Sequence, residues 1–145
     1  MYGDRLEIVD EYKYLGVTVI AGRSFSTSNF KPLIKFRTAV NTILGTFNSP
    51  SEPMLMKLLY SVCVPNLTYA FESISYTSKF FEPLTVALND SIRRIFTFNR
   101  WESVRFLPME FGYPCLVRIF ATRSDRFFER MPLLRNSTLS SLAAL

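Results

Sequence analysis

The feature that most constrains the fold is the spacing of apolar side chains between Phe30 and Phe47. These side chains recur every three or four residues and fall within about 100° of arc on a helix of 3.6 residues per turn: Leu33, Phe36, Val40, Ile43, Leu44 and Phe47. Lys31 and Lys35 lie on the opposite side. Pro32 falls in the first turn, where its missing N–H breaks no hydrogen bond. The pattern predicts an amphipathic helix over residues 30–47.

Similar spacing predicts four more helices, over about residues 54–64, 66–76, 80–98 and 115–131. Pro65 is expected to end or kink the first of them, because proline lacks the donor that the helix needs. The expected core positions are Leu55, Leu58, Leu59 and Val62; Phe80, Leu84, Leu88, Ile95 and Phe98; and Leu116, Val117, Phe120, Phe127, Phe128 and Met131. Residues 100–114 form an irregular connector, in which Trp101 is expected to be a buried anchor.

The first twenty residues have a different character. Residues 6–9 and 12–20 are rich in β-branched and aromatic side chains, which favours two strands of a β-hairpin. Asp10 and Glu11 would form a solvated turn between them. Because a lone hairpin is marginally stable, it should dock on the helices or on a sheet elsewhere in a larger protein.

The predicted fold class is therefore mainly α, with an N-terminal β-hairpin followed by a bundle of about five helices. We divide the chain into a hairpin (1–22), a helical region (23–132) and a tail (133–145). Its 145 residues, 48% of them hydrophobic, suit one domain with its own core. No apolar run approaches the ~18 residues of a membrane span, and no signal peptide is evident. We expect an intracellular protein, in the cytoplasm or nucleus, that is not secreted.

Several kinds of active site are excluded. The chain has no histidine, which removes Ser-His and Cys-His nucleophilic sites and histidine metal sites. Cys63 and Cys115 are far apart and are expected to be buried thiols rather than zinc ligands. No pair of aspartates suits two divalent ions, and no glycine-rich phosphate loop is present. We therefore expect no catalytic residue, no metal site and no cofactor in this chain.

The net charge of +5 comes from the C-terminal part. Residues 1–90 hold eight basic and eight acidic side chains, whereas residues 91–145 hold nine arginines against four acids. Four of these arginines share one face of the last predicted helix: Arg118, Arg123, Arg126 and Arg130. Guanidinium groups suit phosphate oxygens, so the stripe favours nucleic-acid contact. A solvated face that aids solubility is the alternative.

Three segments carry a resemblance to a known family. Residues 12–17 have the sequence Tyr-Lys-Tyr-Leu-Gly-Val, residues 58–72 have the sequence Leu-Leu-Tyr-Ser-Val-Cys-Val-Pro-Asn-Leu-Thr-Tyr-Ala-Phe-Glu, and residues 88–96 include Asn-Asp-Ser-Ile-Arg-Arg-Ile. In order and spacing they resemble the C-terminal region of reverse transcriptases from non-LTR (LINE or jockey-like) retrotransposons. Two features depart from that pattern. Ile74 stands where the family has tryptophan, and the catalytic Phe/Tyr-Ala-Asp-Asp does not precede Tyr12.

The resemblance implies a fragment of an RNA-directed DNA polymerase: the palm edge and the thumb, the helical region that grips the template–primer. The parent family holds Mg²⁺ at aspartates that would lie upstream, so this chain would not be an enzyme by itself. Its partners would be an RNA–DNA duplex or RNA, and the palm and fingers of the parent polymerase. No membrane partner is expected.

The resemblance also implies site residues. Tyr14, Leu15 and Gly16 would form the strand turn near the primer terminus, with glycine allowing close approach of a sugar-phosphate chain. The phosphate-binding candidates are Lys31, Lys35, Arg93, Arg94, Arg118, Arg123, Arg126 and Arg130. Such contacts would be largely independent of sequence.

Two other functions remain open. The chain could be a free-standing helical interaction module that binds protein partners. It could also lie on a membrane surface through its basic amphipathic helix.

Overall fold

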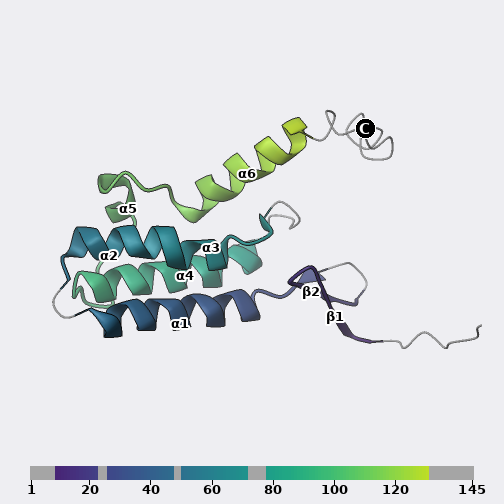
Figure 1. Ribbon diagram of the computed structural model, residues 1–145. Helices are drawn as coiled ribbons and strands as arrows, with labels where there is room; N and C mark the ends of the chain where they lie inside the picture. The colour runs from purple at the N-terminus through teal and green to yellow at the C-terminus, as the bar shows by residue number, and fades with distance from the viewer. Residues whose placement is uncertain (1–8, 23–25, 48–49, 72–77, 131–145) are drawn as a thin grey trace, which may run out of the picture.

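Three short strands at one end of the molecule and a bundle of helices make up the computed structural model (Figure 1). It describes residues 9–22, 26–47, 50–71 and 78–130. The strands are β1 (Glu11–Tyr14), β2 (Val17–Ile20) and β3 (Ser26–Thr27). The main helices are α1 (Phe30–Thr46), α2 (Glu52–Leu58), α3 (Val64–Leu67), α4 (Ser78–Ile95) and α6 (Leu116–Arg130), with a short α5 (Leu107–Glu110). The predicted fold class, mainly helical with an N-terminal hairpin, is confirmed.

The sheet is antiparallel with strand order β1-β2-β3. Tyr14 pairs with Val17 across the hairpin, so the turn falls at Leu15 and Gly16. The prediction of one strand over 12–20, with its turn at Asp10 and Glu11, is therefore wrong. Backbone geometry explains the difference: φ is +45° at Leu15 and +86° at Gly16, as a two-residue hairpin turn of the primed class requires. The predicted strand 6–9 lies almost wholly outside the described residues.

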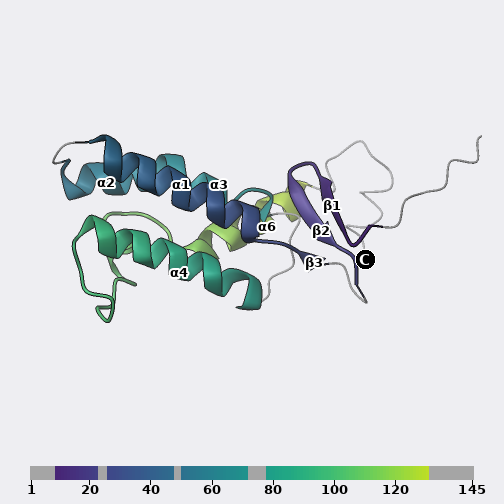
Figure 2. The same cartoon turned by 90° about the horizontal axis from the view of Figure 1, so that it is seen from below.

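The helices pack around one apolar core. In Figures 1 and 2, α2 and α3 run back beside α1, and α4 lies along both. The most deeply buried side chains come from these helices and the turns that follow them: Phe36, Met56, Leu59, Cys63, Leu67, Phe71, Leu84, Ile92 and Val104. Phe71 and Phe81 meet edge to face, with ring centroids 5.2 Å apart. The sheet projects beyond the N-terminal end of α1.

The predicted helix 54–64 does not stop at Pro65. A π-helical turn, η1 (Leu59–Cys63), joins α2 to α3, and the Val64 N–H donates to the Leu59 carbonyl. The wide turn lies just before Pro65, whose missing N–H already prevents a regular bond to the Ser61 carbonyl. The wide turn also changes the direction of the side chains within and after it, relative to a regular α-helix. Val62, predicted to be in the core, is 49% exposed, whereas Cys63 and Val64 are buried.

Two other predicted helices end early. The helix predicted over 66–76 stops at Leu67, because the chain turns through Ala70 at a φ of +58° and so brings Phe71 into the core. The helix predicted to reach Phe98 stops at Ile95. Thr97 there has a φ of +56°, and the Phe98 N–H donates to the Arg93 carbonyl at 2.9 Å, a common helix-ending arrangement.

The last helix has the predicted bounds to within one residue, but its apolar face is only partly covered. Leu116 is buried and Phe120 half-buried, whereas Val117, Phe127 and Phe128 are exposed, Phe128 by 60%. The C-terminal half of α6 diverges from the bundle (Figure 1). The prediction that this whole face lies in the core is therefore wrong. Met131 lies outside the described residues.

None of the helices in the described part of the chain is both long and apolar enough to cross a membrane.

Candidate nucleic-acid interface

The hairpin turn is held against the helices by Tyr69, which follows α3. Its hydroxyl donates to the Leu15 carbonyl at 2.9 Å. Its ring lies so close to Gly16 that a Cβ there would be 3.0 Å from Tyr69 Cε1. Glycine is thus required at position 16 both by its positive φ and by the ring. From the resemblance, a sugar-phosphate chain was expected to approach Gly16 closely. In the structure, the group that approaches Gly16 closely is the Tyr69 ring.

A groove of about 660 Å³ opens around this contact. Its lining comes from the hairpin, the first turns of α1 and the end of α3: Lys13, Gly16, Lys31, Pro32, Ile34, Lys35, Pro65, Asn66 and Tyr69. We call it the lysine groove. It brings together three of the chain's five lysines. None of the described lining residues is acidic.

Lys13, Lys31 and Lys35 are exposed, and among the described residues none of the three forms an ion pair. Ammonium groups in this setting are available to anions from outside the chain, and phosphate is the anion that lysine clusters commonly contact. Lys31 and Lys35 were predicted as site residues, whereas Lys13 and Tyr69 were not. Lys13 lies within segment 12–17 of the resemblance. Successive side chains of a strand point to opposite faces, so Lys13 lies on the other face of β1 from Tyr12 and Tyr14. This was the only signal in the sequence for a separate role of Lys13.

Tyr14 does not line the lysine groove. It lies on β1 with 64% of its surface exposed, close to Leu15, which is 75% exposed. Leu15 contributes its backbone carbonyl to the Tyr69 contact. Of the three predicted turn residues, Gly16 alone lines the groove.

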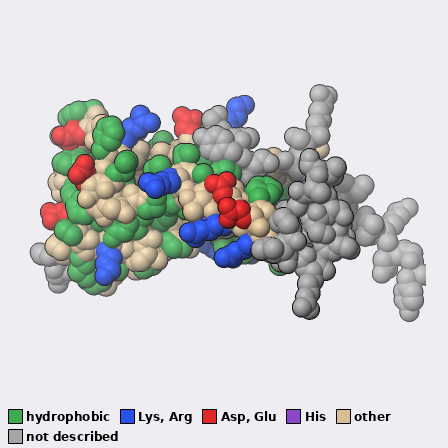
Figure 3. All heavy atoms as spheres, turned by 90° about the horizontal axis from the view of Figure 1, so that it is seen from above, with side chains coloured by type: hydrophobic (Ala, Val, Ile, Leu, Met, Phe, Trp, Pro, Cys, Tyr) green, Lys and Arg blue, Asp and Glu red, His purple; other side chains and the backbone are tan. Residues whose placement is uncertain are grey.

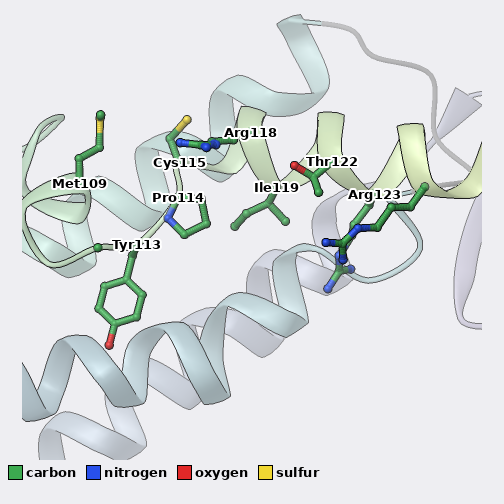
Figure 4. A pocket seen from close by; sticks show the side chains of 10 residues that line it. Met109, Tyr113, Pro114, Cys115, Arg118, Ile119, Thr122 and Arg123 are labelled. Atoms are coloured by element: carbon green, nitrogen blue, oxygen red, sulfur yellow. The ribbon is translucent and has the colours of Figure 1, made fainter.

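A second groove, of about 690 Å³, lies between α6 and the connector before it. Arg118, Ile119, Thr122, Arg123 and Arg126 come from α6, and Met109, Gly112, Tyr113, Pro114 and Cys115 come from α5 and the connector. Figure 4 shows Ile119, Thr122 and Arg123 on the side of α6 that faces the other helices. We call it the arginine groove. It unites three of the four predicted stripe arginines; Arg130 is exposed, beyond the groove.

Arg123 has a structural contact within this groove. Its Nη1 donates to the Thr68 carbonyl at 2.6 Å, across 55 residues of sequence. Thr68 precedes Tyr69, so adjacent residues of one turn contact α6 and the hairpin. Arg118 and Arg126 are exposed.

Arg93 and Arg94 also make contacts inside the protein. Arg93 bonds to the Asp90 carboxylate at 2.9 Å and donates through Nε to the Glu102 carbonyl at 3.0 Å. Arg94 donates to the side chain of Asn41 on α1 at 2.8 Å. These bonds tie α4 to the connector and to α1. They give both arginines a role in stability beside any role in binding.

Basic groups are not confined to one face. On the side of the molecule seen in Figure 3, lysine and arginine side chains alternate with acidic ones and form no continuous patch. The described lining of the two grooves, by contrast, includes no acidic residue.

Neither cysteine belongs to a metal site in the described part of the chain, where no group of three or more suitable ligands occurs. Cys63 is buried, and burial raises the pKa of its thiol to about 11. The prediction that Cys115 is buried too is wrong: it is exposed at the wall of the arginine groove.

Nearby, Tyr60 and Tyr113 stack with ring centroids 4.3 Å apart, and burial is the main cause that raises the pKa of Tyr60 above its usual range.

Trp101, predicted to be a buried anchor, is 83% exposed. The connector follows the positive-φ turn at Thr97, which directs residues 99–101 along the surface. Val104, a less conspicuous residue of the same connector, is fully buried.

Comparison with known proteins leaves the family open, since no family model, no curated protein and no solved structure matches the chain.

Proposed function

We propose that this chain is a non-catalytic, thumb-like segment of a reverse transcriptase, and that it grips the template–primer duplex through phosphate contacts in the lysine groove. The observation that carries the proposal is the contact of Leu15 and Gly16 with Tyr69, because Gly16 and Tyr69 both line that groove. Leu15 and Gly16 belong to the first segment that resembles the polymerase family, and Tyr69 belongs to the second. Two stretches far apart in sequence thus line one groove, whose cations are Lys13 of the first stretch and Lys31 and Lys35 of α1.

The chemistry of the groove fits a polyphosphate backbone. Lys13, Lys31 and Lys35 supply point charges on flexible stems, which can follow phosphates of any base sequence. Tyr69 and Gly16 also line the groove and offer little that could read base edges, and the side-chain nitrogen of Asn66 donates to the Val62 carbonyl within the helix. Binding should therefore be independent of sequence and should weaken as salt rises, because counterions are released from the nucleic acid.

The proposal assigns no chemical step to this chain. The resemblance places the metal-binding aspartates of the parent polymerase upstream of Tyr12. A primer-extension assay with the chain alone should therefore give no nucleotide incorporation. Incorporation would contradict the assignment as a non-catalytic segment.

The direct test is binding of a labelled RNA–DNA duplex to the triple variant Lys13→Ala, Lys31→Ala, Lys35→Ala. A matched control removes three exposed cations that lie outside both grooves: Lys57, Lys79 and Arg105. At about 50 mM salt, we expect the groove variant to bind at least about tenfold more weakly, equivalent to ~1.4 kcal/mol. The control should change affinity by less than about threefold. If duplex affinity fell equally in the two triple variants, the loss would come from the change in net charge alone. That result would contradict the proposal.

A second candidate function has its own observation. Trp101 and Phe106 are strongly exposed on the connector, and exposed aromatic side chains of this kind often anchor protein partners. A helical interaction module of this type would bind a protein partner with little dependence on salt. Its binding would be lost on Trp101→Ala and retained in the lysine-groove triple, the reverse of what the polymerase proposal expects.

A further inference from the structure

The arginine groove differs from the lysine groove in the arrangement of its cations. Arg118, Thr122 and Arg126 are spaced four residues apart, so they follow one line along α6. With a rise of 1.5 Å per residue, the Cα atoms of the two arginines are ~12 Å apart. Two guanidinium groups at this separation suit two phosphates of one strand better than a single phosphate group.

The rest of the groove lining is largely apolar. Met109 and Pro114 come from α5 and the connector, Ile119 comes from α6 itself, and the exposed thiol of Cys115 lies beside them (Figure 4). A polyphosphate backbone alone would leave this apolar lining without a partner. The bases of a duplex are stacked inside it, whereas the bases of a single strand are free to lie against apolar side chains and arginine planes.

We propose that the arginine groove binds single-stranded nucleic acid, with its phosphates on Arg118 and Arg126 and its bases against the apolar lining. This inference rests on the proposed function, because it extends the same nucleic-acid surface. The ligand class follows from guanidinium planes that lie beside apolar side chains along one helix. The lysine groove also has apolar lining, at Pro32, Ile34 and Pro65, but its cations are ammonium point charges.

The position of the two grooves agrees with one continuous ligand. Arg123 of the arginine groove bonds to Thr68, and Tyr69 of the lysine groove bonds to Leu15. The two grooves therefore flank the same turn. A strand that leaves a duplex held in the lysine groove has a cationic path onward along α6. Asp125 and Glu129 are both exposed on α6. Asp125 lies two turns after Arg118, on nearly the same face, so the two acidic groups limit that path to the N-terminal part of the helix.

The test uses the full chain and two labelled probes: an unstructured oligonucleotide of about 12 residues and an RNA–DNA duplex of roughly one helical turn. The groove variant is Arg118→Ala with Arg126→Ala, which avoids Arg123 because of its bond to Thr68. The control pair is Arg100→Ala with Arg105→Ala, which removes the same charge from exposed positions outside the arginine groove. Circular dichroism and thermal melting should be unchanged in both.

We expect single-strand affinity to fall about tenfold in the groove pair and less than about threefold in the control pair. In the lysine-groove triple it should also fall less than about threefold, while duplex affinity falls as described above. Equal losses in the two arginine pairs, or no single-strand binding by the unaltered chain, would overturn the inference. So would competition by uridine monophosphate as strong as competition by the oligonucleotide, which would mark a free-nucleotide site.

The two proposals fail separately in this design. Duplex affinity that is unchanged in the lysine-groove triple contradicts the proposed function, whatever the single-strand result. Single-strand affinity that is unchanged in the Arg118→Ala, Arg126→Ala variant overturns the further inference and does not affect the proposal for the lysine groove.

Discussion

The Tyr69 hydroxyl donates a hydrogen bond of 2.9 Å to the Leu15 carbonyl, across 54 residues of sequence. This bond and the packing of the Tyr69 ring on Gly16 join the hairpin to the helices. They place Lys13 of the hairpin opposite Lys31 and Lys35 of α1 in one groove. The stability of this contact and the shape of the candidate site are therefore linked.

Gly16→Ala should destabilise the fold. The new Cβ would lie 3.0 Å from Tyr69 Cε1 at a φ of +86°, and both the contact and the conformation are unfavourable for alanine. We expect the free energy of unfolding to fall by about 1–3 kcal/mol in urea denaturation. Gly45→Ala is the matched control, since it lies within α1 with no atom within 4 Å of the added Cβ. It should raise stability by about 0.5–1 kcal/mol. A neutral Gly16→Ala would contradict the close packing.

Leu15→Asn should stabilise the hairpin. Leu15 holds a φ of +45°, which asparagine adopts more readily than leucine, and Asn-Gly is the favoured pair for such a turn. Because the Leu15 side chain is exposed, little packing is lost. We expect a gain of about 0.5–1 kcal/mol and slower amide hydrogen exchange in β1 and β2. A loss of stability would show that the leucine side chain makes contacts important to the fold.

Arg123 and Arg126 should behave differently although both line the arginine groove. Arg123→Ala removes the bond to the Thr68 carbonyl and should lower the free energy of unfolding by about 1–2 kcal/mol. Arg126→Ala should change it by less than about 0.5 kcal/mol, because the residue is exposed. Urea denaturation of the two variants, which lose the same charge, separates the structural role from the charge. Equal free energies of unfolding in the two variants would contradict a structural role for Arg123.

The fold should lose stability at alkaline pH. Burial raises the pKa of the Cys63 thiol from 9.0 to about 11, so the folded state binds this proton more tightly than the unfolded chain does. The resulting contribution is fully present below pH 9 and is lost as pH rises toward 11, by roughly 1 kcal/mol per pH unit. Burial of Tyr60, which also raises its pKa, adds to the loss from about pH 10 upward.

Denaturation of the Cys63→Ala variant across this window provides the control. Its pH dependence between pH 9 and 10 should be flatter than that of the unaltered chain. Thiol labelling at neutral pH provides a second readout: Cys115 should react in the folded protein, and Cys63 only after unfolding. Rapid labelling of both thiols in the folded state would contradict the burial of Cys63.

Much of the helical architecture follows from local pattern. The period of apolar residues predicted α1 and α6 to within one or two residues at each end, because each is a single uninterrupted helix. It also predicted the basic face of α6 that became the arginine groove. Where the backbone leaves the regular helix, as in the π-helical turn before Pro65, the same pattern assigned Val62 to the core wrongly.

The candidate site itself could be predicted only in part. Lys31 and Lys35 stood out as a polar face of one helix. Their union with Lys13 depends on a turn at Leu15 and Gly16 and on a tertiary contact with Tyr69, and neither is visible in local periodicity. Similarly, no local pattern distinguishes the exposed Trp101 from a buried tryptophan, because its position depends on how the chain leaves α4.

The most direct test of the lysine groove as a phosphate-binding surface is the salt dependence of duplex binding. The logarithm of the binding constant should fall linearly with the logarithm of salt concentration, with a slope of about −0.9 per phosphate contact. In the triple variant of Lys13, Lys31 and Lys35 the slope should be less negative by up to ~3. In the triple variant of Lys57, Lys79 and Arg105 it should change by less than about 1. Identical slopes in the two triples, or duplex binding that does not respond to salt, would contradict the account.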